Sequence, residues 1–117
     1  MSEVINLEQK LSLFLETYSP KIIGNYNGND IMVVKVKGDF VWHNHPDTDD
    51  FFLVLKGQLK IRLRDGIVTL NPGELYIVPK AVEHCPFADE ETHLMLIEPT
   101  GTLNTGDEKT AVHKPKI

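Results

Sequence analysis

Beyond Pro20 the sequence is a succession of short β-rich runs, and this pattern constrains the fold more than any other feature. Turn residues separate the runs, among them Asn27-Gly28-Asn29, Asp65-Gly66 and Pro72-Gly73. Short strands at this spacing are typical of an all-β sandwich or barrel. The predicted strands cover residues 21–25, 30–36, 40–45, 50–55, 59–63, 67–70, 75–78, 83–86 and 93–98.

A chain of 117 residues is expected to form one domain with one core. We divide it into an N-terminal helical segment at 1–20, a barrel at 21–99 and a C-terminal tail at 100–117. Apolar residues at helical spacing predict one amphipathic helix over 7–17, with Asn6 as its N-cap and Gln9 as the partner of that cap. The residues at this spacing are Leu7, Leu11, Phe14, Leu15 and Tyr18.

The charge balance excludes some classes of partner. With 12 basic and 17 acidic residues the formal net charge is -5, and the lysines and arginines form no cluster. We therefore expect neither a nucleic-acid partner nor an anionic membrane surface. The sequence shows no signal peptide and no run of about 20 apolar residues, and its one cysteine, Cys85, excludes an internal disulfide. These features predict a cytoplasmic protein.

Two histidines separated by one residue, His43 and His45, carry the clearest chemical signal. Side chains alternate between the faces of a strand, so both imidazoles should project to the same side. A carboxylate follows at Asp50, and a third imidazole lies further along the chain at His84. Imidazoles suit zinc, iron, nickel and copper, and a carboxylate extends the choice toward iron and manganese. The sequence therefore predicts a mononuclear metal site.

The residues around these histidines resemble the two sequence motifs of the cupin superfamily. Gly38-Asp39-Phe40-Val41-Trp42-His43-Asn44-His45 leads to Asp50 and then to Gly57, as in the first motif. Gly73-Glu74-Leu75-Tyr76-Ile77-Val78-Pro79 leads to His84, as in the second. The resemblance covers roughly residues 33–98 and is closest to small single-domain, metal-binding cupins.

The resemblance implies a jelly-roll barrel, or double-stranded β-helix, that holds one divalent zinc, iron, manganese, nickel or copper ion. Its ligands would be His43, His45, His84 and Asp50, with Asp50 at the position of the family's glutamate. The shorter aspartate leaves three alternatives: closer approach of the strand, a bridging water, or a three-histidine site with the carboxylate behind it. Asp50 is preferred over Asp49 because the distance to Gly57 matches the family pattern. Ala81 stands where the family often has glycine.

The predicted strand at 50–55 is apolar on both faces. If Asp50 points into the barrel, Phe52 and Val54 follow it, which leaves Phe51, Leu53 and Leu55 on the outer face. A strand buried on both sides needs a cover. We expect a second copy of the chain to supply it in a homodimer, and the alternative is the N-terminal helix of the same chain.

The side chains expected around the ion are mainly apolar. We predict a pocket formed by Phe40, Phe52, Val54, Phe87 and Met95. Apart from the ligands, no inward position on the motif strands offers an obvious general base or second carboxylate. Arg62 and Arg64 share one face of their strand, where a surface role is favoured over contact with a substrate anion. Cys85 should face away from His84 as a buried structural thiol.

The sequence leaves two functions open. The first is a metal-dependent enzyme, an oxygenase or isomerase of cupin type, that acts on a small organic molecule. Small cupins like this one are often described as similar to sugar-phosphate isomerases, but that similarity concerns the fold alone. The second is a non-catalytic module that binds or senses a small metabolite in the same pocket. A storage role is disfavoured by the short chain and the acidic metal site. Small cupins also carry a stretch like Pro99–Asp107, which points to a packed tail.

Overall fold

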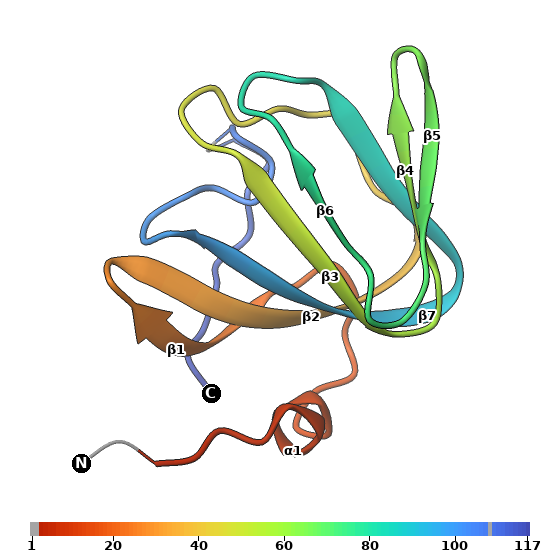
Figure 1. The fold of residues 1–117 in the computed structure, drawn as a ribbon. Coiled ribbons are helices and arrows are strands. Elements are labelled where there is room, and N and C mark those ends of the chain that lie inside the picture. The colour runs from red at the N-terminus through yellow and green to blue at the C-terminus, as the bar shows by residue number, and fades with distance from the viewer. Residues whose placement is uncertain (1–2, 108) are drawn as a thin grey trace.

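The computed structural model describes residues 3–107 and 109–117 and shows one short helix followed by seven strands (Figure 1). The helix is α1 (Leu7–Leu11). The strands are β1 (Lys21–Tyr26), β2 (Asn29–Asp39), β3 (Asp50–Lys56), β4 (Leu59–Leu63), β5 (Gly66–Leu70), β6 (Leu75–Val78) and β7 (His84–Pro99). The predicted all-β, jelly-roll fold with one short N-terminal helix is confirmed.

The strands form one antiparallel sheet around the long strand β7. The order is β1-β2-β7-β3-β6, and β4 pairs with β7 as well as with β5. The first residues of β7 pair with β4, whereas its later residues lie between β2 and β3. Figure 1 shows that β7 bends, so that the β4–β5 hairpin stands opposite β3 and β2 across the interior. This curvature encloses the space in which the site lies.

The interior is filled by apolar side chains that alternate along the strands. In β3, Asp50, Phe52 and Val54 are buried and the residues between them are only half-buried, which confirms the predicted parity. The main core comprises Met32, Val34, Val36, Phe52, Val54, Leu59, Ile61, Leu70, Val78, Ala88, Leu94 and Leu96. This apolar core lies beside the polar site, and Phe52 belongs to the core while its ring contacts that of His84.

The N-terminal helix is shorter than predicted. Asn6 does cap it, since its Oδ1 accepts from the backbone N–H of Gln9 at 2.9 Å. The helix nevertheless ends at Leu11, because the following segment bonds to the barrel instead: the Phe14 carbonyl accepts from the buried Lys35 ammonium at 2.7 Å, and the Tyr18 N–H donates to the Lys35 carbonyl at 2.8 Å. These contacts replace the hydrogen bonds of further helical turns.

The segment 3–18 covers β2 more than β3. A second apolar cluster joins Leu11 and Phe14 to Ile23 and Val33, and Leu55 packs against it. Consequently β2 is buried on both faces from Met32 to Val36. The segment 3–18 thus covers the outer face of β3 at the Leu55 end.

Two predicted strand boundaries are wrong. Residues 40–45 form no strand: the Phe40 N–H donates to the Pro86 carbonyl, and beyond that only His43 pairs, with His84. Pro86 has no N–H to return, which prevents a continuous ladder. Residues 83–86 and 93–98 are parts of the single strand β7, because the polar run Asp89-Glu90-Glu91 interrupts the apolar pattern but not the strand.

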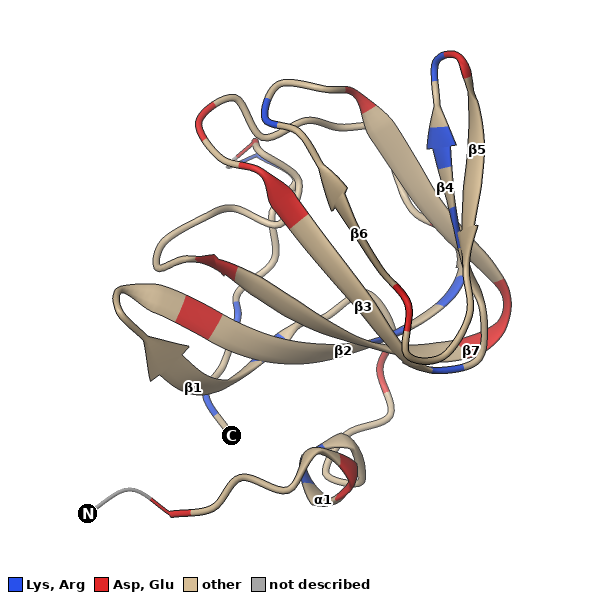
Figure 2. Ribbon diagram, in the orientation of Figure 1, with Lys and Arg blue, Asp and Glu red and all other residues tan. Residues whose placement is uncertain are grey.

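Figure 2 shows Lys and Arg spread along the chain, with several on β4. No helix in residues 3–107 or 109–117 has the length and apolar character needed to cross a membrane.

An apolar strip lies on the outer face of β3 and β6. It is the surface on which the predicted homodimer can be tested. Phe51 lies opposite Ile77 and Leu53 opposite Leu75, and the two β6 residues are 48% and 53% exposed. We define these four residues as the outer strip. Burying it against a second copy would remove apolar surface from water on an edge strand.

Wild-type protein should therefore scatter light as a dimer, and Leu53→Lys should yield monomer or insoluble protein. The control is Ile67→Lys, which changes an exposed apolar residue of β5 outside the strip. A monomeric mass for dilute wild-type protein would contradict the expectation.

Candidate metal centre

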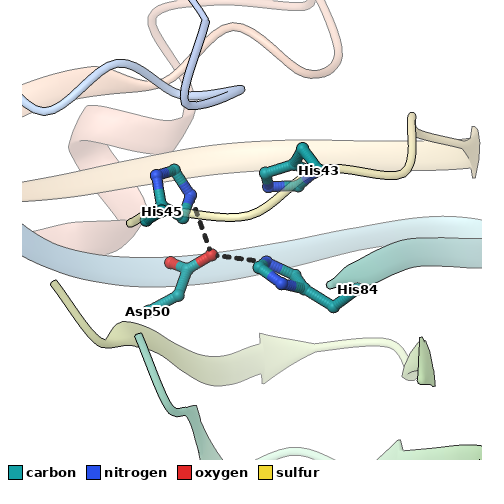
Figure 3. Close-up of side chains that lie close together, drawn as sticks. All are labelled: His43, His45, Asp50 and His84. Atoms are coloured by element: carbon teal, nitrogen blue, oxygen red, sulfur yellow. Dashed lines mark hydrogen bonds and ion pairs between the residues drawn. The ribbon is translucent and has the colours of Figure 1, made fainter. Parts of the chain in front are cut away.

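Four buried side chains converge at one end of the barrel (Figure 3). Asp50 is the first residue of β3 and His84 the first of β7, while His43 and His45 lie in the loop that connects β2 to β3. One ligand atom from each of the four residues lies within 4.8 Å of the others. The two histidines expected to share one face do so, although the segment that carries them is not a strand.

Hydrogen bonds to the backbone orient two of the imidazoles. His43 Nδ1 lies 2.9 Å from the Val41 carbonyl, and His84 Nδ1 lies 2.9 Å from the Val82 carbonyl. A carbonyl only accepts, so in each ring Nδ1 carries the hydrogen. In the neutral form Nε2 then presents a lone pair toward the group. Metal-binding histidines are commonly oriented by this second hydrogen bond.

The contact between Asp50 and His84 places two acceptors together. Asp50 Oδ2 lies 2.8 Å from His84 Nε2, and both side chains are almost fully buried. With Nδ1 of His84 already donating, a neutral ring and a carboxylate would direct lone pairs at each other. The contact is stable only with a positive charge at this point, either a proton on Nε2 or a cation that both atoms bind.

His45 provides a buried nitrogen without a hydrogen bond. Its Nε2 lies 3.2 Å from Asp50 Oδ2, close enough for an ion pair, yet the orientation is not that of a hydrogen bond. Burial lowers the pKa of His45, but the neighbouring Asp50 outweighs it and the pKa is raised. Burial would raise the pKa of Asp50, but His45 and His84 hold it well below its usual range. The group therefore contains an ionised carboxylate among imidazoles.

This arrangement fits a divalent transition metal. Ligand atoms about 2.1 Å from a common ion lie up to about 4.2 Å apart, comparable with the spread of the four residues. An ion would also satisfy the orphaned His45 nitrogen and separate the two acceptors of Asp50 and His84. On these observations the donor set of three imidazoles and one carboxylate suits zinc, iron, manganese, nickel or copper.

The loop that carries His45 is tied to the turn that precedes β7. The Ala81 N–H donates to the His45 carbonyl at 2.8 Å, and the Lys80 N–H donates to Asp49 Oδ1 at 2.9 Å. Ala81 adopts a positive φ of 68°, which costs about 1 kcal/mol for a residue with a Cβ and explains why glycine would suit this position. Asp49 thus fixes the loop while Asp50 faces the imidazoles.

Other residues considered from the sequence lie outside the group. The Arg62 guanidinium pairs with Asp39 and lies over the Phe87 ring, and that of Arg64 pairs with Glu83. Cys85 is buried. His93 pairs with Glu91 and His113 is exposed in the tail.

A small, mainly apolar cavity of about 50 Å³ adjoins the group, with His43 and Asp50 among its lining residues. Of the five residues predicted to line it, Phe40 and Phe52 do so, whereas Val54, Phe87 and Met95 do not. Phe87 packs under Arg62, and Met95 pairs with Leu53 on the outer face. The lining residues are Tyr18, Pro20, Val34, Val36, Phe40, His43, Asp50, Phe52, Pro86, Leu94, Leu96, Glu98 and Asn104.

A second carboxylate, that of Glu98, lies inside the barrel, so the expectation that no inward position carries one is wrong. Glu98 is 4% exposed near the end of β7 and lines the cavity. Burial and the nearby Asp50 raise the pKa of Glu98, although Lys114 acts in the opposite direction. The alternation Leu94, Leu96, Glu98 along β7 could have revealed it, because residues two apart share a face.

The C-terminal tail packs against the site. Lys114 Nζ donates to Glu98 Oε2 at 2.9 Å and to the Thr102 carbonyl, and Asn104 lines the cavity. At Gly106 a Cβ would collide with the Asn44 carbonyl, and φ is 73°, so only glycine fits this approach to the histidine loop. Composition alone could not show these contacts.

Comparison with known proteins assigns the family. The family model of the cupin domain matches residues 30–100, well over half of the chain. The protein therefore belongs to the cupin family.

Individual relatives agree. A crystal structure of a cupin-2 domain containing protein from Shewanella frigidimarina is 50% identical, with 82% of this chain and 94% of that chain covered and a TM-score of 0.81. The YdbB protein of Bacillus subtilis is 29% identical over 85 residues, which span 72% of this chain and 75% of YdbB. Hydroquinone 1,2-dioxygenase from Sphingomonas sp. TTNP3, solved in complex with 4-nitrophenol, has a TM-score of 0.72 at 18% identity over 83% of this chain and 32% of its own, a likeness of fold alone.

Acid should destabilise the metal-free protein through His43. Burial lowers the pKa of His43 to about 4, below its usual 6.5. As the pH falls below 6.5 the unfolded chain takes up a proton that the folded chain accepts only near pH 4, so the free energy of unfolding decreases across this window. The loss due to His43 should approach about 3 kcal/mol.

Urea unfolding of chelator-treated protein at several pH values measures this loss. His43→Gln should reduce the dependence on pH between 6.5 and 4, whereas His113→Gln, at an exposed tail residue, should retain it. Equal dependence in wild-type protein and His43→Gln would contradict the assignment to His43.

Proposed function

We propose that this cupin binds one divalent transition-metal ion through His43, His45, Asp50 and His84 and is a metal-dependent enzyme that acts on a small organic molecule. The observation that carries the proposal is the buried Asp50 carboxylate, which faces His84 at 2.8 Å and His45 at 3.2 Å with one imidazole nitrogen left without a hydrogen bond. A cation bound by these atoms satisfies all of them together.

The protein's own residues set how a substrate would meet the ion. Val41 and Val82 orient two imidazoles through their carbonyls, and the bond from Ala81 to His45 positions the third. The cavity beside the group is lined largely by apolar side chains, with His43 and Asp50 at its surface, so a ligand that fills it would displace water from the proposed ion. When bound, the ion would supply Lewis acidity or a site for dioxygen.

Fold likeness to a dioxygenase supports a small organic substrate only in general terms. The Sphingomonas enzyme is a hydroquinone 1,2-dioxygenase, and its structure is a complex with 4-nitrophenol. At 18% identity its reaction cannot be carried over. It supports the proposal to the extent that a barrel of this shape can receive a small organic ligand.

A second candidate is a cupin that binds or senses a small metabolite without transforming it. The observation in its favour is that Glu98, the one carboxylate of the cavity wall outside the metal-binding group among the described residues, already pairs with Lys114 at 2.9 Å. Lys114 acts against the rise in the pKa of Glu98 that burial causes, so the paired carboxylate is a weaker general base than an unpaired one at the same place would be. Turnover of a bound ligand in the metal-loaded protein separates the two candidates.

Metal content is the direct test of the proposal. Untagged protein should contain close to one transition-metal ion per chain by elemental analysis. His84→Ala should lower the affinity by at least about 100-fold, because it removes one of four ligands from a preformed group. The fold should survive, since the apolar core is separate.

The matched control is His93→Ala, which removes an imidazole outside the group and should keep full metal content. Wild-type protein that takes up none of zinc, iron, manganese, nickel and copper would overturn the proposal.

The choice between neighbouring aspartates gives a second test. Asp50→Glu should retain the metal and Asp50→Ala should weaken its binding, because only residue 50 faces the imidazoles. Asp49→Ala should leave metal content unchanged and lower stability by about 1 kcal/mol, since it removes the hydrogen bond from Lys80. Greater loss of metal from Asp49→Ala than from Asp50→Ala would mean that Asp49 is the ligand and that the assignment to Asp50 is wrong.

A further inference from the structure

Among the described residues that line the cavity, one acidic side chain, Glu98, is not used by the proposed metal-binding arrangement. Glu98, on β7, forms part of the cavity wall, which is otherwise made largely of aliphatic and aromatic side chains. Only 4% of the surface of Glu98 is exposed. Burying a carboxylate in such surroundings is costly unless it is paired. The hydrogen-bond partners of Glu98 therefore show which part of its carboxylate is free to contact a ligand.

Only one of its two oxygens is engaged by the protein. Oε2 accepts from Lys114 Nζ at 2.9 Å, and Lys114 is in turn fixed by the Thr102 carbonyl. Within residues 3–107 and 109–117, Oε1 accepts no hydrogen bond, although Glu98 lines the cavity. Lys114 thus holds the carboxylate in place and leaves Oε1 able to accept a hydrogen bond from a ligand.

The charges around the cavity restrict the ligand further. Asp50 and Glu98 are both acidic, and no Lys or Arg is among the described residues that line the cavity. With the proposed ion held at Asp50, an anionic group placed at the Glu98 end of the cavity would still face a carboxylate and no Lys or Arg among the described lining residues. The volume of about 50 Å³ admits the head of a small molecule, with its body against Phe40 and Phe52.

We propose that Glu98 is the specificity-determining residue of the pocket and accepts a hydrogen bond from a hydroxyl group on a small, uncharged and otherwise apolar ligand. Lys114 and the tail segment that carries it position the carboxylate for this contact. This inference rests on the proposed function, because it assigns a ligand contact to the cavity beside the metal-binding group.

Binding of two matched probes to the full chain tests the inference. Phenol and fluorobenzene have the same number of non-hydrogen atoms, and of the two only phenol can donate a hydrogen bond. Titrations followed by NMR should show phenol bound roughly tenfold to a hundredfold more tightly by wild-type protein, the range expected for a hydrogen bond to a charged acceptor.

The variant Glu98→Leu with Lys114→Met removes the acceptor and its counter-charge together, so no unpaired charge is left buried. In this variant phenol and fluorobenzene should bind equally. The control Asp89→Leu with Lys60→Met deletes an ion pair of the same kind that lies at the surface, and it should keep the preference for phenol.

Equal binding of the probes by wild-type protein, no phenol binding up to its solubility limit, or a preference that persists in the Glu98 and Lys114 double variant would each overturn the inference. Elemental analysis of the same samples keeps the two proposals apart. Metal-free protein that still prefers phenol would refute the metal proposal and support the role of Glu98, whereas metal-loaded protein without the preference would do the reverse.

Discussion

Burial of the Asp50 charge is the interaction on which the rest of the site depends. A carboxylate that is 3% exposed is tolerated only with compensating positive charge or hydrogen-bond donors, and here its closest neighbours are imidazoles. The first residue of β7, the loop after β2 and the turn at Ala81 all converge on this group. Their backbone hydrogen bonds fix the rings before any ligand arrives, so the fold preorganises the site.

The sequence predicted the barrel and the four converging residues because both depend on local spacing. Alternation along β3 placed Asp50, Phe52 and Val54 on one face, and the turn signals located most strand boundaries. The histidines were found through two motifs whose register is set by glycines. Ala81 shows the limit of that reasoning, since its strained φ of 68° becomes visible only in the structure.

What the sequence did not predict depends on contacts between distant segments. The helix ends at Leu11 rather than at residue 17 because Lys35, which lies on β2, donates a hydrogen bond to the Phe14 carbonyl. Likewise, the polar tail gave no periodic signal, yet Lys114 reaches Glu98 beside the cavity. In both cases one long-range polar contact outweighs the local propensity of the chain.

The placement of Lys114 and Asn104 has a consequence for how specificity is encoded in this chain. Residues 30–100, which match the cupin family, carry all four side chains that we propose to bind the metal. Part of the pocket wall and the counter-ion of Glu98 come from outside that range, at Tyr18, Pro20, Asn104 and Lys114. If the proposed function holds, changes in the terminal segments would alter which molecule the pocket admits and would leave the four converging side chains in place. Selectivity and reactivity would then be separable within a single small domain.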